Sequence, residues 1–153
     1  MKKPYLFVSA AVALAVLAMS ARGADPAPAP AQAADPSVEK VVTVKLKLSA
    51  EKPGLAVGIE SVTPDPVELS RSKKNVAHWV LSPADSGTLK ITMEDKGGKP
   101  FKKNPASRGK RDHVYSDPAE LGADGSKHKY TVTVRADGQG KDFVLDPLII
   151  IRP

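Results

Sequence analysis

Three segments of the chain alternate apolar and polar side chains with a period of two. They are VVTVKLKLS (41–49), TLKITMED (88–95) and HKYTVTVRA (128–136). Successive side chains of a strand point to opposite faces, so this alternation predicts three strands with one face in a core and one face in water. The residues expected to point inward are Val42, Val44, Leu46, Leu48, Leu89, Ile91, Met93, Tyr130, Val132 and Val134.

Shorter apolar segments between turn residues predict the remaining strands. These are LAVGIESV (55–62), VEL (67–69), NVAHWVLS (75–82) and DFVLDPLIII (142–151). The only candidate for a helix is one or two turns in SDPAELGADG (116–125). The pattern therefore predicts an all-β chain folded as an antiparallel, Greek-key or immunoglobulin-like sandwich of about seven to eight strands.

The C-terminal region has features of its own. RADGQGKD (135–142) contains the Asp-Gly and Gly residues that a hairpin loop requires. Leu148 to Ile151 is an unbroken apolar run, which predicts a central strand covered on both faces. Pro147 cannot donate a backbone hydrogen bond, so we expect a bulge or strand crossing just before that run.

The N-terminal region has the composition of an export signal. Lys2 and Lys3 precede an apolar run from Tyr5 to Met19, which the small residues Ala21 and Gly23 follow, and this pattern predicts a signal peptide over 1–23. Residues 24–38 are rich in Pro and Ala and predict an extended linker, and the folded domain is expected over 39–153. The protein is therefore expected to be periplasmic or extracellular, with membrane attachment only if the signal is not cleaved. The chain has no cysteine, so its core must be stable without disulfides.

Positive charge is concentrated in one segment. The expected loop at 95–127 is much longer than an ordinary connection. Its first half has seven basic residues and no acidic one between positions 96 and 111: Lys96, Lys99, Lys102, Lys103, Arg108, Lys110 and Arg111. Such a run is either a solvated insertion or a patch for an anionic partner, such as an envelope component or an acidic protein. Nucleic acid is not expected, because the compartment lacks it and no aromatic residues alternate with the cations.

The stretch NVAHWVLS joins the only tryptophan to a histidine. Period two directs Trp79 to the core and His78 to the opposite face. His78, His113 and His128 are too far apart in sequence to form a metal-binding motif on one element, so they could share a metal only through the fold. The chain has no cysteine nucleophile, no G-x-S-x-G nucleophile elbow and no H-E-x-x-H metalloprotease motif, and the sequence predicts neither an enzyme nor a cofactor.

The stretch VTPDPVELSRSKKNVAHWVLS (62–82) resembles cupredoxin-like domains, in which a Pro-rich turn and a short strand lead to a strand with a tryptophan. The C-terminal stretch 130–151 is similar to the end of small secreted bacterial proteins. A type 1 copper site in the cupredoxin family uses two His, a Cys and usually a Met. This chain has no Cys, and its last loop has neither His nor Met, so that redox function does not carry over.

Two functional expectations follow. The first is a non-enzymatic binding module of the cell envelope that contacts an anionic partner through the basic residues of the long loop. The alternative is a metal-handling protein of cupredoxin-like fold that uses His78, His113 and His128 for copper or zinc in a site that is not type 1.

Overall fold

A computed structural model of the chain describes residues 38–94 and 100–153. The expected signal peptide, all of the expected linker except Val38, and the loop residues Lys96 and Lys99 lie outside the described residues. No helix in the described ranges is long and apolar enough to cross a bilayer.

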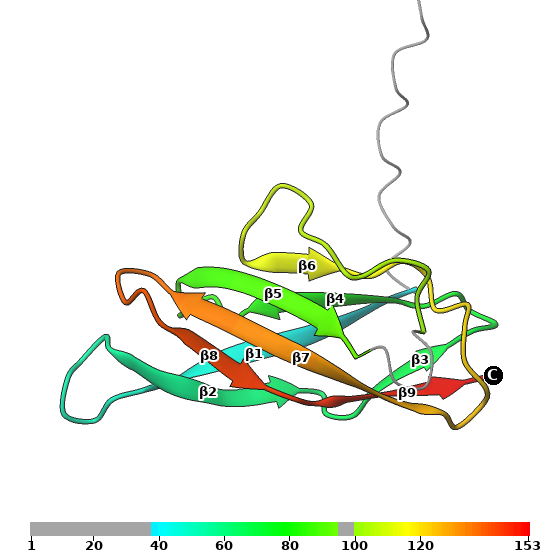
Figure 1. Cartoon of the computed structure of the whole chain (residues 1–153), viewed down its shortest axis with the longest axis horizontal. Helices are drawn as coiled ribbons and strands as arrows, with labels where there is room; N and C mark the ends of the chain where they lie inside the picture. The colour runs from blue at the N-terminus through cyan, green and yellow to red at the C-terminus, as the bar shows by residue number, and fades with distance from the viewer. Residues whose placement is uncertain (1–37, 95–99) are drawn as a thin grey trace, which may run out of the picture. The chain divides into compact units, whose positions relative to one another are not determined.

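The described residues form an all-β structure with nine strands (Figure 1). The strands are β1 (Glu39–Leu48), β2 (Ala56–Thr63), β3 (Val67–Ser70), β4 (Val76–Leu81), β5 (Gly87–Met93), β6 (His113–Tyr115), β7 (Lys127–Ala136), β8 (Asp142–Leu145) and β9 (Leu148–Arg152).

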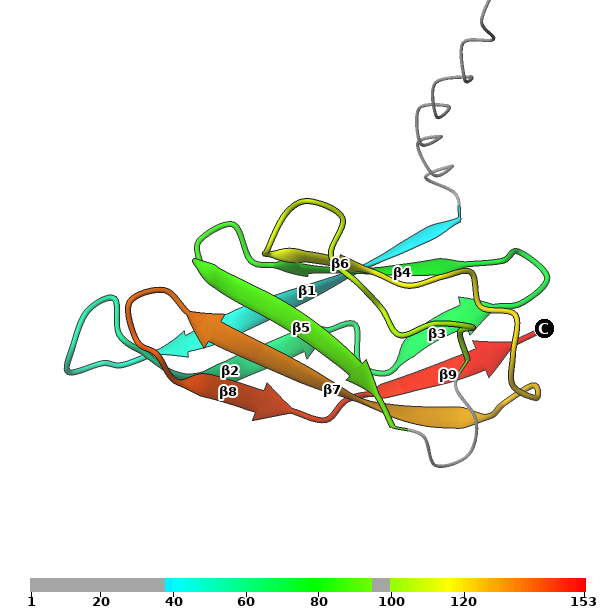
Figure 2. The same ribbon diagram turned by 45° about the horizontal axis from the view of Figure 1, so that its top comes forward.

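Two curled sheets face each other around one core, as in a β-sandwich (Figure 2). The first sheet has the order β2-β1-β4-β6, and the second has the order β3-β9-β7-β5, with β8 beside β7. Trp79 from the first sheet and Tyr130 from the second are both fully buried, and their ring centroids lie 5.5 Å apart. The expected role of Trp79 as an anchor between the sheets is confirmed.

The alternation that predicted the long strands is confirmed in β5 and β7, whose inward residues are all buried. It fails at one position in β1. Leu48 is the last residue of β1 and is 52% exposed, whereas Leu46 is buried. The pairing with β2 is irregular at this end, because Lys47 pairs with Gly58 and Leu48 with Ala56, which leaves Val57 as an extra residue of β2.

The sheets are mixed rather than purely antiparallel. β1 pairs with β4 in parallel, and β3 pairs with β9 in parallel. After β2 the chain leaves the first sheet, adds β3 to the second sheet and returns as β4, so β4 runs in the same direction as β1. The alternation of side chains is the same in parallel and antiparallel strands, and the pattern could not distinguish them.

The C-terminal strands follow the prediction in part. β8 and β9 pair with successive halves of β7, and the interruption falls at Asp146 and Pro147 as expected. β9 is central, between β3 and β7. Its residues nevertheless alternate, because Ile149 and Ile151 are fully buried whereas Leu148 and Ile150 are half-buried.

Two local features hold the edges of the core in place. Asn75 is buried, its Oδ1 accepts from the backbone N–H of Ser70 at 2.9 Å, and its Nδ2 donates to the carbonyl of Val38 at 3.0 Å. Gly87 begins β5 so close to β7 that a Cβ there would lie 2.6 Å from the carbonyl oxygen of Arg135. Only a residue without a side chain fits at that position.

Candidate functional site

The outward face of the first sheet holds a group of ionisable side chains, which we call the outer-face cluster: Glu39, His78, Asp112, His113 and Tyr115. His78 lies opposite Tyr115 in the β4–β6 pair, and His113 lies opposite Val80 two positions along. Because alternate residues of a strand share a face, both histidines point away from Trp79 and toward each other.

The two carboxylates and the two histidines of the cluster form a chain of contacts. Glu39 Oε1 contacts His78 Nδ1 through a short hydrogen bond. The other ring nitrogen of His78, Nε2, lies 2.8 Å from Nδ1 of His113. Asp112 Oδ2 lies 3.7 Å from the second ring nitrogen of His113, Nε2. A carboxylate therefore flanks each end of a histidine pair.

The rings of the cluster are stacked and partly covered. The His78 ring lies on the Tyr115 ring with centroids 4.0 Å apart and planes 14° apart. Burial lowers the pKa of His78 below its ordinary value, and the nearby Glu39 offsets part of that change. Burial also raises the pKa of the Tyr115 hydroxyl. Burial therefore favours the neutral form of the His78 ring.

The basic loop is anchored at both ends of its described part. Phe101 is buried and meets Trp79 edge to face, with centroids 6.4 Å apart. Ala106 and Tyr115 exchange two backbone hydrogen bonds of 2.9 Å. Residues 106–112 consequently form an arch beside β6 (Figure 1). The short strand β6 lies within the segment that the sequence predicted as one long loop.

The cations of this loop differ in their surroundings. Lys102 pairs with Glu120 at 2.5 Å, and Arg111 pairs with Asp137 at 2.5 Å. Arg108 lies over the Tyr115 ring, with its guanidinium carbon 5.2 Å from the centroid. Lys103 and Lys110 are exposed and form no ion pair with the described residues. The loop is therefore partly neutralised.

The third histidine is elsewhere. His128 is buried on β7 in the second sheet, and its Nε2 hydrogen-bonds Ser126 Oγ at 2.9 Å. The fold thus brings His78 and His113 together and keeps His128 in a separate, structural environment. Within residues 38–94 and 100–153, no group of three or more His, Asp or Glu side chains is arranged to hold a metal ion.

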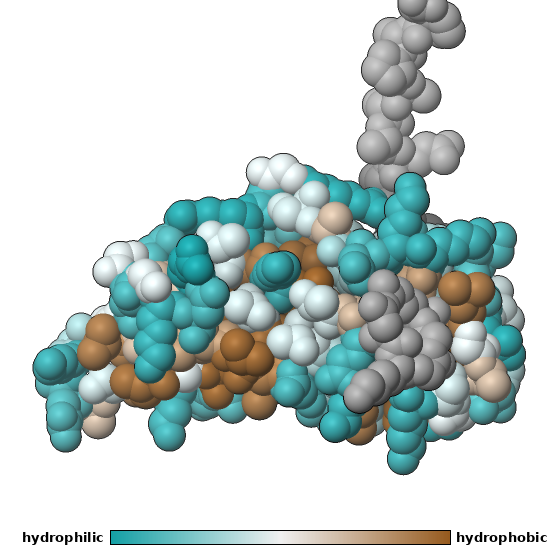
Figure 3. All heavy atoms as spheres, in the orientation of Figure 1, coloured by the Kyte–Doolittle hydropathy of each residue, from teal (hydrophilic) through white to brown (hydrophobic). Residues whose placement is uncertain are grey.

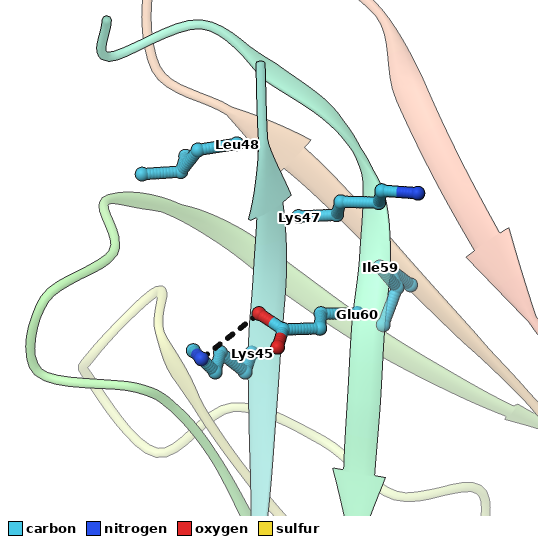
Figure 4. Close-up of a pocket in the computed structure, with 5 residues that line it drawn as sticks. All are labelled: Lys45, Lys47, Leu48, Ile59 and Glu60. Atoms are coloured by element: carbon cyan, nitrogen blue, oxygen red, sulfur yellow. Dashed lines mark ion pairs between the residues drawn. The ribbon is translucent and has the colours of Figure 1, made fainter. Parts of the chain in front are cut away.

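A separate hollow lies on the outer surface of β1 and β2 (Figure 4). It is open and shallow, and it is lined by Lys45, Lys47, Leu48, Ile59 and Glu60. Lys45 and Glu60 point toward each other across it and form an ion pair of 2.9 Å. Lys47 is the one further ionisable side chain in its lining, and the hollow does not include any residue of the outer-face cluster.

Comparison with known proteins adds no family. The sequence matches no protein-family model, and no curated protein matches it as a relative. The cupredoxin-like and immunoglobulin-like resemblances therefore have no support beyond the β-sandwich character of the fold. The function must be argued from the residues themselves.

Sequence reasoning missed the role of Glu39 and Tyr115. Glu39 lies 39 residues before His78, and the two meet because β1 and β4 pair in parallel. Tyr115 meets His78 through the β4–β6 pair. No local sequence pattern indicates either contact, because both depend on which strands pair with β4.

Proposed function

We propose that this chain is an exported, non-enzymatic binding module of the cell envelope that contacts an anionic component through its basic loop. The observation that carries the proposal is a local excess of positive charge on an anchored segment. Residues 100–111 have five cations and no acidic residue, and only Lys102 and Arg111 have acidic partners in the described structure. Lys103, Arg108 and Lys110 remain for a ligand.

The anchoring of residues 101–111 to the core and to β6 favours the binding of a ligand by these cations. Phe101 is held in the core, and the Ala106–Tyr115 bridge closes the base of the arch. A segment already held in place loses less conformational entropy when a ligand binds. The cation of Arg108 is also held against an aromatic face, where it can donate hydrogen bonds to phosphate or carboxylate.

The surface around the loop is consistent with a polar partner. Hydrophilic side chains cover most of the face drawn in Figure 3, with separate hydrophobic areas between them. The large exposed apolar residues of the described chain are Val41, Leu48, Leu55, Val57, Leu121, Val144 and Leu145. They are spread over three strands and two loops, whereas the cations occupy one loop.

The test compares two triple variants of equal charge change. One variant, Lys103→Ser/Arg108→Ser/Lys110→Ser, removes the three loop cations that have no acidic partner among the described residues. In the control, exposed lysines far from residues 100–111 in sequence are removed by Lys47→Ser/Lys52→Ser/Lys141→Ser. Binding to vesicles of zwitterionic lipid with and without an anionic phospholipid is measured by co-sedimentation at low and high salt.

Each basic residue near an anionic surface contributes about 1 kcal/mol, so the loop variant is expected to bind roughly 100-fold more weakly than wild type. The control variant is expected to retain most of its affinity, and high salt is expected to weaken all binding. Competition by lipopolysaccharide or by an acidic glycan distinguishes the sources of the anionic group. Equal losses in both variants, or no binding to any of these anions at low salt, would refute the proposal.

Export is tested separately. The predicted cleavage after Gly23 requires the mature protein, recovered from the periplasm or the medium, to begin at Ala24 by N-terminal sequencing. A protein found only in the cytoplasm, or one that begins at Met1, contradicts that part of the proposal.

A further inference from the structure

The two histidines of the outer-face cluster face each other through one nitrogen of each ring. A neutral imidazole carries one N–H, and the contact with Glu39 places the proton of His78 on Nδ1. The lone pair of His78 Nε2 then faces His113 Nδ1 at 2.8 Å. What occupies that short gap depends on the tautomer of His113.

The two tautomers of His113 use this gap differently. With its proton on Nδ1, His113 donates a hydrogen bond to Nε2 of His78, and one proton joins the two inner nitrogens. With its proton on Nε2, His113 directs its N–H toward the side of Asp112, and the lone pairs of both inner nitrogens face each other across 2.8 Å. In that second tautomer both inner nitrogens are available to one cation, which takes the place of the shared proton.

The separation of the nitrogens suits a metal ion. Bonds from imidazole nitrogen to Zn²⁺ are about 2.0 to 2.1 Å long, so two such ligands at right angles lie roughly 2.9 Å apart, and at the tetrahedral angle roughly 3.3 Å. The observed 2.8 Å is therefore within a few tenths of an ångström of a cis pair of ligands. Divalent copper takes square-planar sites with such angles and binds nitrogen ligands most strongly among the first-row divalent ions.

The surroundings of the pair match the outer shell of a metal site. Metal-binding histidines usually direct their second ring nitrogen to a carboxylate, which sets the tautomer and the orientation of the ring. Here Glu39 does so for His78, and Asp112 faces the second nitrogen of His113. The His113 side chain is 21% exposed, so solvent can supply the remaining ligands.

We propose that His78 Nε2 and His113 Nδ1 together bind one divalent transition-metal ion, with Glu39 as a positioning residue. The site has two protein ligands and open positions for water. It is distinct from the loop cations, and its test does not depend on whether the loop binds an anion.

The test uses the full chain and Cu²⁺ alone as the probe. Isothermal titration measures stoichiometry and affinity, and electron paramagnetic resonance of the bound Cu²⁺ detects coupling to imidazole nitrogens. Wild type is expected to bind one Cu²⁺ with two coupled nitrogens. His113→Gln and His78→Gln are expected to bind at least 10-fold more weakly, whereas His128→Gln, which changes the histidine outside the cluster, is expected to bind like wild type.

Glu39→Gln separates positioning from ligation. It is expected to lower the affinity for Cu²⁺ by about 10-fold to 100-fold while the two-nitrogen signal persists, since both ligands remain. If His78→Gln fails to fold, His113→Gln on the short edge strand β6 carries the test, with circular dichroism as the check of folding. No binding at excess Cu²⁺, wild-type affinity in His113→Gln, or an equal loss in His128→Gln would overturn the proposal.

Discussion

The hydroxyl of Tyr130 allows a sharp test of the core. Tyr130 is fully buried in β7, and neither its hydroxyl nor the indole N–H of Trp79 makes a hydrogen bond of normal geometry with the described residues. A buried polar group without a partner costs about 1 to 3 kcal/mol. Tyr130→Phe keeps the ring and removes only the oxygen. We therefore expect the variant to have a free energy of unfolding about 1 kcal/mol higher than wild type at pH 7, and a Tm higher by roughly 4 °C.

The effect should grow at alkaline pH. Burial raises the pKa of Tyr130 above its ordinary value of 10.0, and the nearby Trp79 N–H offsets only a smaller part. Below pH 10 the phenol is neutral in both states and its contribution is constant. Above pH 10 the unfolded chain ionises the phenol while the folded protein does not, so wild type loses up to about 1.4 kcal/mol per pH unit from this group. The difference between the proteins should therefore reach about 2 kcal/mol at pH 11.

The assay is urea denaturation at pH 7 and pH 11, followed by the fluorescence of the single tryptophan. Tyr115→Phe is the control, because the Tyr115 ring is only half-buried. A loss of 1 kcal/mol or more in Tyr130→Phe at pH 7 would show that the hydroxyl has a hydrogen-bond partner after all. An unchanged alkaline slope would refute the reasoning about burial.

Three further substitutions test the packing, each measured by urea denaturation followed by circular dichroism. Gly87→Ala should lower the free energy of unfolding by about 1 to 3 kcal/mol, because the new Cβ would meet the backbone of β7. Gly58→Ala is the control, since the space around its new Cβ is open, and it should change stability by less than about 0.5 kcal/mol. Asn75→Ala should cost about 2 kcal/mol, since it leaves a buried N–H and a carbonyl without partners; a cost near zero would mean that water replaces the amide. Trp79→Ala should cost about 3 to 5 kcal/mol and Leu48→Ala almost nothing, and similar costs would contradict the assigned burial.

The sequence predicted the loop cations more completely than it predicted the histidine pair. The run of loop cations is visible in the sequence alone, yet the ion pairs of Lys102 and Arg111 depend on acidic residues 18 and 26 positions away. The position of His78 on the face opposite Trp79 followed from period two. Its meeting with His113, 35 residues further along, required the pairing of β4 with β6.

By itself, the sequence determined that the chain is all-β, which residues of the long strands enter the core, and where positive charge gathers. These properties depend on residues one or two positions apart in the sequence. Because successive side chains of a strand point to opposite faces, the local pattern indicates which residues are buried. Only the tertiary structure decided that β1 and β4 are parallel, that Leu48 leaves the core, and that His78 and His113 meet while His128 does not. Strand order and direction arise from contacts between distant segments, and alternation is the same whichever strand lies alongside.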